Sequence, residues 1–449
     1  MTADGAALLA AVLARARARG ATAADGVLVE ERRFRASVRL GEVDTVTHAR
    51  EQRLALRVFA GRAQAAASTS DLSPASLERL VDEATALARA TAEDPHAGLP
   101  DPAELGDGVP DLDLVDRAAP ADEPPEAKIA LARRAEEAAL AADPRIVNSE
   151  GADYWERRAR YTFASTAGVT RGYETSSFGV HVTPVAARDG EMQRDAWYAM
   201  ARKRAALPDP AEVGRVAAAR ALRRLGARKA RTAEVPVVFD PETAASLLRA
   251  FAAAASGPSL YRRASFLVGR LGARVASPAV TIVDDALIPA GLGSRPFDGE
   301  GLPTRRTVLV REGVLESYLL DTYSARKLGL RSTRHATRDA AGVGVGTTNL
   351  MLLPGPATPE ELIASVREGL YVTELIGFGV NGVTGDYSRG AAGIWIEHGR
   401  LAAPVQEVTI AGNLLDMFQA IEAVANDLVL RDRTSAPTLK IARMVVAGT

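Results

Sequence analysis

Residues 26–67 form the stretch GVLVEERRFRASVRLGEVDTVTHAREQRLALRVFAGRAQAAA, in which short runs alternate apolar and polar side chains. Alternation with a period of two, together with many β-branched residues, predicts a meander of short β-strands. A helix is expected on each side of this meander. One covers residues 4–19, and the other begins at Ser73 as N-cap with Pro74 as its first helical residue.

A second unit of the same design follows along the chain. Residues 126–142 predict an amphipathic helix, residues 145–205 alternate as strands, and residues 209–227 predict a closing helix. The predicted fold class is α+β, with N-terminal helix-plus-strand-meander units followed by a β-rich C-terminal domain. The expected divisions are an N-terminal α/β unit at 1–95, a Pro-rich linker at 96–125, a second α/β unit at 126–230 and the β-rich C-terminal domain at 231–449.

Composition narrows the classes of function. Among 449 residues, 55 Lys and Arg stand against 56 Asp and Glu, and this balance favours neither nucleic acid nor a membrane surface as partner. No stretch is long and apolar enough to predict a membrane span, and the start lacks the apolar core of a signal peptide, so we expect a cytoplasmic protein. The chain has no cysteine, which excludes disulfides and thiolate metal sites.

Known catalytic motifs are absent from the sequence. The histidines have no metal-ligand spacing, being His48, His96, His181, His335 and His398, so no metal site is predicted in this chain. Ser388 stands in a turn-rich stretch without a G-x-S-x-G motif or a neighbouring histidine, and we interpret it as a turn residue. Residues 342–346 are rich in glycine but lack the spacing and the following helix of a dinucleotide-binding loop.

Two long polar loops are the candidate binding segments. Residues 294–306 and 381–390 each join apolar segments, and binding groups are frequently placed on such loops. The candidate substrate-binding residues are Asn381, Thr384, Asp386 and Arg389 in one loop and Arg295, Asp298 and Glu300 in the other. Each loop also has an alternative without substrate binding. In the 381–390 loop, Asp386 caps a turn and Arg389 is a surface charge. In the 294–306 loop, the charged residues pair with one another.

Several stretches of the chain resemble one protein family. The longest is TELIGFGVNGVTGDYSRGAAGIWIEHGRLAAPVQEVTIAGNLLDMF at 373–418, and a second is SRPFDGEGLPTRRTVLVREGVLESYLLDTYSARKLG at 294–329. Together with VPVVFDPETAASLLRAF at 235–251 and the closing TLKIARMVVAG, they resemble the TldE (PmbA) branch of the TldD/PmbA family. The resemblance covers nearly the whole chain, and it implies the same α/β and β-rich division.

The resemblance also implies what this chain lacks. TldD-type subunits resemble metallopeptidases with an HExxxH helix and a later cysteine. Alignment of the shared strand and helix start puts Arg249 and Ala254 at the two histidines and Ala250 at the glutamate. The cysteine-bearing loop corresponds to RDRTSA, between Leu430 and Pro437. No metal ligand carries over, because a guanidinium offers no lone pair and a methyl group offers none either.

The family therefore implies a non-catalytic subunit that completes the chamber of a TldD-like, HExxxH-containing partner in a heterodimer. Zinc or another divalent metal is expected in that partner, and none in this chain. The implied substrate is an unfolded or leader peptide, or a peptide-like natural-product intermediate. A stand-alone binding or regulatory homodimer is the alternative. A third possibility, an independent hydrolase using Ser388 or the Asp298/Glu300 carboxylates, has no supporting triad spacing.

Overall fold

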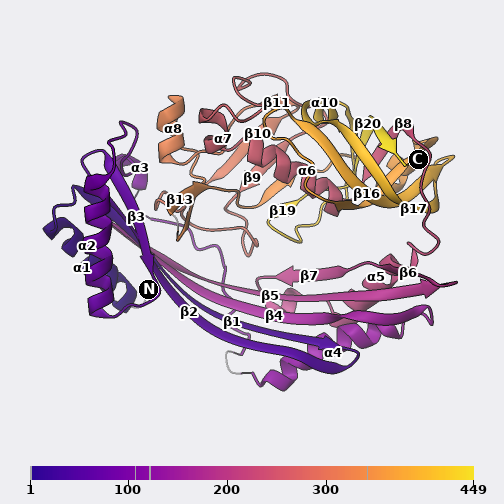
Figure 1. The fold of residues 1–449 in the computed structure, drawn as a ribbon, viewed down its shortest axis with the longest axis horizontal. Helices are drawn as coiled ribbons and strands as arrows, with labels where there is room; N and C mark the ends of the chain where they lie inside the picture. Colours follow the sequence, from indigo (N-terminus) through magenta and orange to yellow (C-terminus); the bar gives the residue numbers. More distant parts are fainter. Residues whose placement is uncertain (1–2, 107, 121–122, 341, 449) are drawn as a thin grey trace.

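A computed structural model describes residues 3–106, 108–120, 123–340 and 342–448. Its N-terminal part is built on long strands rather than the short ones predicted (Figure 1). β1 (Ala23–Arg39) and β2 (Glu42–Ala60) form one hairpin that spans most of the predicted meander. Its turn is formed by Leu40 and Gly41, both with positive φ, which is the backbone of a tight two-residue hairpin turn.

The two predicted helix-plus-strand units share a single sheet. β4 (Ile146–Ser165) pairs antiparallel with β1 from Asp25 to Val38, and β5 (Val169–Arg188) pairs with β4. The strand order is β3-β2-β1-β4-β5-β6, with β7 also paired to β5. The remaining strands are β3 (Ala63–Thr69), β6 (Glu191–Arg194) and β7 (Trp197–Ala201).

Four helices cover one face of this sheet, in pairs at its two ends (Figure 1). α1 (Ala3–Ala18) and α2 (Pro74–Ala90) pack on Leu28 of β1. The predicted Ser73 cap of α2 is confirmed, because the Ser73 side chain accepts a hydrogen bond from the backbone N–H of Ser76. α4 (Pro125–Leu140) and α5 (Pro210–Leu222) pack on Phe34. Between the units the described chain is largely irregular, apart from α3 (Pro102–Leu105). A short 3₁₀ turn at Arg204–Ala206 lies between β7 and α5.

The C-terminal region is rich in short strands. One sheet has the order β17-β16-β15-β8-β20-β18, and an extra pairing of β17 with β20 closes it on itself. Its strands are β8 (Ala233–Phe239), β15 (Glu368–Ile376), β16 (Asp386–Glu397), β17 (Arg400–Asn413), β18 (Ile421–Val424) and β20 (Leu439–Ala447). A second sheet, in the order β11-β10-β9-β14-β19, comprises β9 (Ile282–Asp285), β10 (Arg306–Arg311), β11 (Val314–Leu315), β14 (Leu350–Leu352) and β19 (Thr434–Ser435). The predicted α+β class is confirmed.

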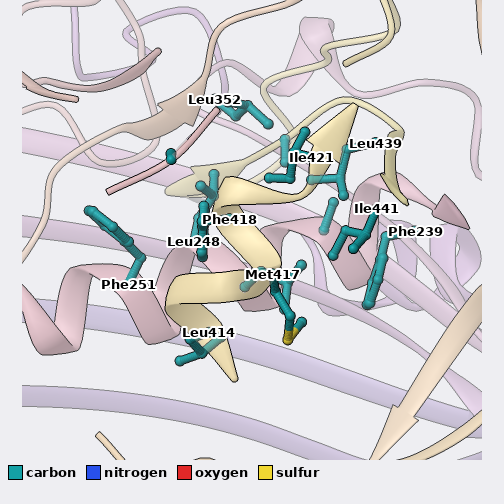
Figure 2. Packing of buried hydrophobic residues seen from close by; sticks show 14 of the residues in the cluster. Phe239, Leu248, Phe251, Leu352, Leu414, Met417, Phe418, Ile421, Leu439 and Ile441 are labelled. Carbon is teal, nitrogen blue, oxygen red and sulfur yellow. The ribbon is translucent and has the colours of Figure 1, made fainter. Parts of the chain in front are cut away.

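The core of this region forms around two helices, α6 (Pro241–Ala254) and α10 (Leu414–Gln419). Figure 2 shows Leu248 and Phe251 of α6 next to Phe418 of α10, with the rings of Phe251 and Phe418 centred 5.1 Å apart. Smaller elements surround this core: α7 (Gly257–Tyr261), α8 (Thr322–Leu328), α9 (Pro359–Ala364), β12 (Ala336–Asp339) and β13 (Gly342–Val345). Among the described helices, none combines the length and apolar character needed to cross a bilayer.

Charged side chains join the long sheet to the C-terminal region in a buried network. Arg57 of β2 forms an ion pair with Asp25 of β1 and a second one, of 3.2 Å, with Glu300. Arg338 of β12 approaches the other oxygen of Asp25 at 2.8 Å. Burial raises the pKa of Asp25, but Arg338 and Arg57 outweigh it, so the pKa is lowered and the carboxylate stays ionised.

We expect Arg57→Ala to lower the free energy of unfolding by about 3–5 kcal/mol, because it leaves the buried Glu300 and Asp25 carboxylates short of a partner. Urea unfolding at neutral pH measures this loss. Arg311→Ala is the matched control, since Arg311 pairs with Glu316 at the surface and its removal should change little. Equal, small losses in both variants would show that the network does not hold the two parts together.

Candidate functional site

The site begins where β8 ends and α6 starts. Asp240 caps the helix and accepts hydrogen bonds of 2.9 Å from both the backbone N–H and the hydroxyl of Thr243. Pro241 follows at the first helical position, where its missing N–H needs no partner. Burial raises the pKa of Asp240 to about 6, in spite of these hydrogen bonds and the nearby Arg220 guanidinium.

The positions on α6 that align with metal ligands do not fit a metal. Arg249 is exposed, Ala250 is half-buried against the core, and Ala254 is buried. A guanidinium and two methyl groups supply no lone pair for coordination. Within residues 3–106, 108–120, 123–340 and 342–448, no three His, Asp or Glu side chains gather in a way that could hold a metal ion.

Two cavities flank this helix. One, of about 330 Å³, is lined by Arg249 and the hydroxyl side chains of Ser256, Thr347 and Thr434. The other, of about 320 Å³, is lined by residues 426–432 together with Tyr198 and Glu242. The segment that replaces the cysteine-bearing loop therefore lines both cavities. Their volumes are at the small end for ligand pockets, and they suit a few residues of a peptide.

The second cavity is formed by both parts of the molecule. Tyr198 of β7 donates a hydrogen bond of 3.2 Å to Glu242, in the first turn of α6. Arg431 lies 3.8 Å from the same carboxylate and stacks over the Trp197 ring, 4.5 Å from its centre. These groups offer charge and hydrogen bonds to a molecule bound in the cavity.

Both ring nitrogens of the buried His335 have polar partners in the structure. Its two ring nitrogens lie 3.0 Å from the Asp284 carboxylate and 2.9 Å from the Thr333 hydroxyl. The partner Asp284 could not be identified from the sequence, because it lies 51 positions away. Ser388 is exposed on β16, far in sequence from this pair, and its hydroxyl makes none of the hydrogen bonds described for the chain.

The structure brings together three of the candidate residues in the 381–390 loop. Asn381 accepts hydrogen bonds from the backbone N–H groups of Val383 and Thr384, and the Thr384 hydroxyl donates one of 2.6 Å to Asp386. All three polar residues are exposed. Arg389 is half-buried, and its Nε makes none of the described hydrogen bonds. The loop is therefore held in shape by its own side chains, while substrate contact stays a prediction.

The 294–306 loop is placed differently. Asp298 is 2% and Glu300 1% exposed, and Asp298 accepts hydrogen bonds from the backbone of Glu300 and Leu302. Glu300 also accepts a hydrogen bond of 2.8 Å from the backbone of Thr322. Arg295 is half-buried, with Nε and one terminal nitrogen lacking a described partner. No described hydrogen bond or ion pair joins this loop to residues 381–390. Its two carboxylates serve the junction between sheet and C-terminal region.

An exposed apolar surface adjoins the 381–390 loop, and we call residues 376–383 the apolar tip. Ile376 and Val383 are each 54% exposed, and the Phe378 side chain is completely exposed. A hydrogen bond of 3.2 Å from Phe266 to the Gly382 carbonyl connects the apolar tip to a neighbouring loop, which exposes Val268 and Leu271. The run AAGIWI at 391–396, which follows on β16, is buried in contrast.

Three family models match the chain. They are described as PmbA/TldA metallopeptidase domain 1, central domain and C-terminal domain, and they match residues 24–88, 118–225 and 232–448. The chain belongs to the PmbA/TldD metallopeptidase family. Metalloprotease PmbA of Escherichia coli O157:H7 is 39% identical over 92% of this chain and 89% of that protein.

Solved structures of family members have the same fold. A Bacteroides thetaiotaomicron protein, described as a candidate modulator of DNA gyrase, superposes with a TM-score of 0.92 at 28% identity and covers both chains fully. TldE from Thermococcus kodakarensis superposes with a TM-score of 0.86 over 98% of this chain and all of that one. At 20% identity, that second likeness shows the fold alone.

We expect Asp240→Asn to remove a pH dependence of stability. The folded pKa of about 6 lies above the ordinary value of 3.8, so the folded chain binds more protons than the unfolded chain between these values. Stability should therefore fall as pH rises from 4 to 6, by on the order of 2 kcal/mol relative to the variant. Asn keeps the helix cap. Urea midpoints of both proteins across this range measure the difference, and parallel profiles would contradict a raised pKa at Asp240.

Proposed function

We propose that this chain is the non-catalytic, TldE-like subunit of a heterodimeric metallopeptidase. In this proposal a TldD-like, HExxxH-containing partner carries zinc or another divalent metal, and the present chain completes the chamber around the peptide. The proposal rests on the side chains of α6. Arg249, Ala250 and Ala254 stand at the positions that the resemblance aligns with metal ligands, and none of them can coordinate a metal. The chain keeps the fold of the family although all of these groups are replaced. A role other than catalysis explains this combination best.

The apolar tip supports a partner surface. A fully exposed Phe378, with Ile376 and Val383 beside it, is an unfavourable arrangement in water and a favourable one in a protein interface. Val268 and Leu271 extend this surface on the connected loop. The polar residues of the 381–390 loop begin within the tip, at Asn381, so a partner seated there would lie next to the candidate peptide contacts.

Peptide contact is assigned to that polar loop. Asn381, Thr384 and Asp386 together offer amide, hydroxyl and carboxylate groups at the surface, and Arg389 adds a guanidinium on the same strand. Extended peptide backbone requires both donors and acceptors along its length. The substrates we propose are unfolded or leader peptides, or a peptide-like intermediate of a natural-product pathway.

The test is reconstitution with an HExxxH-containing family member encoded beside this chain. The isolated chain should cleave no unfolded peptide, and the co-purified pair should cleave it. Phe378→Glu should abolish both association and cleavage, since it places a charge in the apolar contact, and leave the melting temperature of the isolated chain unchanged. Size-exclusion chromatography with light scattering, a peptidase assay and thermal unfolding give the three readouts. Leu401→Glu, at an exposed leucine on β17, is the matched control.

Chelator-resistant cleavage by the isolated chain would contradict the proposal and direct attention to an overlooked nucleophile. Full association of the Phe378→Glu variant would remove the apolar tip as the partner surface. Stable self-association without any affinity for the HExxxH-containing protein would favour the stand-alone homodimer instead.

A further inference from the structure

A row of three arginines crosses the helix-covered face of the long sheet. Arg32 of β1 is directly opposite Arg50 of β2 on one side and Arg158 of β4 on the other. We call these residues the arginine row. Residues Leu28 and Phe34 of β1 are covered by the two helix pairs, so the row lies in the uncovered gap between them (Figure 1).

Like charges directly opposite each other destabilise a sheet unless something neutralises them. Arg32 and Arg50 are exposed, and neither forms any of the ion pairs or hydrogen bonds described for the chain. Arg158 donates only to the backbone carbonyls of Asp116 (3.1 Å) and Ala119 (2.8 Å). The row therefore carries three positive charges with no carboxylate bound to them among the described residues.

The rows on either side offset only part of this charge. On one side, Arg160 lies 3.8 Å from the Glu30 carboxylate and donates a hydrogen bond of 2.9 Å to Glu174, so this row holds two carboxylates against one guanidinium. On the other side, Glu156 pairs with Lys128 of α4. The neighbouring rows thus supply one excess negative charge against the three positive charges of the arginine row.

The opposite face of the same strands gives an internal comparison. There Arg33 and Arg157 are also directly opposite each other, and the buried Glu31 carboxylate forms an ion pair with both. The chain therefore supplies its own anion where the sheet faces the C-terminal region. It supplies none on the arginine row, which faces solvent.

The arginine row lines a cavity of about 970 Å³, together with Val115 from the segment between the two units. Six arginines and four glutamates line this cavity in all, so its lining carries an excess of positive charge: Arg32, Arg33, Arg50, Arg53, Arg158 and Arg160 against Glu30, Glu31, Glu51 and Glu174. Neighbouring strands are about 4.8 Å apart, so three strands place the guanidinium stems along a line of roughly 10 Å. A line of cations in an open groove suits a linear chain that carries several carboxylates, because a single small oxyanion cannot bridge the whole line.

We propose that this groove binds an extended, acidic peptide segment across the strands, with the segment's carboxylates paired to the arginine row. Guanidinium groups favour carboxylates through paired, charge-assisted hydrogen bonds. The site is separate from α6 and from the apolar tip, and it goes beyond the proposed function because it requires neither a partner subunit nor a metal.

The probe is a short fluorescein-labelled peptide of alternating Glu and Thr, titrated with the full-length chain and followed by fluorescence anisotropy. Binding should saturate and should weaken as salt is raised. Arg32→Glu and Arg50→Glu should each weaken it by about tenfold or more, since each replaces an attraction by a repulsion. Arg400→Glu makes the same charge change at an exposed arginine of β17 and should leave binding unchanged. Melting temperatures of the variants should not fall below that of the original chain, because Arg32→Glu and Arg50→Glu each relieve repulsion within the row.

Three outcomes would overturn the proposal. One is the absence of saturable binding, and another is an equal loss in Arg400→Glu, which would show attraction to net charge alone. The third is equal binding of a matched peptide of alternating Gln and Thr. A parallel titration with tripolyphosphate separates a peptide from a small polyanion as the source of negative charge. If tripolyphosphate binds and the Arg32→Glu and Arg50→Glu variants weaken its binding, while the Glu-containing peptide does not bind, the groove is a site for a small polyanion and the peptide proposal is refuted.

Discussion

The buried ion network of Asp25, Arg57 and Glu300 fixes how the long sheet meets the C-terminal region. Charges removed from water are unfavourable unless each is paired, so separation of the two parts would leave these buried groups without partners. The Tyr198–Glu242 contact beside α6 is formed by the same two parts of the molecule. The 294–306 loop, which the sequence marked as polar and functional, acts in the structure as a component of this junction.

Local signals were sufficient to predict the helices but not the length of the strands. The helices at Ser73–Pro74 and Pro241 were predictable because their caps and first residues carry strong preferences. Charged residues such as Glu30 and Glu31 interrupt the apolar alternation, which favours breaks between short strands. They are compatible with a continuous long strand because they pair with arginines of the neighbouring strand, as Glu31 does with Arg157, and one strand's sequence does not contain that information.

The candidate site was predictable where its residues bond to neighbours a few positions away in the sequence. The 381–390 loop is polar, exposed and held by bonds between residues two or three positions apart, which its Asn, Thr and Asp spacing already suggests. The burial of Glu300 was not predictable, because its partner Arg57 is 243 positions away. The Arg32–Arg50–Arg158 row was likewise invisible until the strand register placed the three side chains opposite one another.

In the proposed heterodimer the metal ion belongs to the partner, because Arg249 of α6 offers no lone pair for coordination. Native mass spectrometry of the purified two-chain complex measures where the metal is bound. We expect one copy of each chain with a single metal ion, which disappears when the partner's HExxxH histidines are replaced by alanine. A second metal ion, or one that persists after that replacement, would place a metal site in this chain and refute the proposed division of roles.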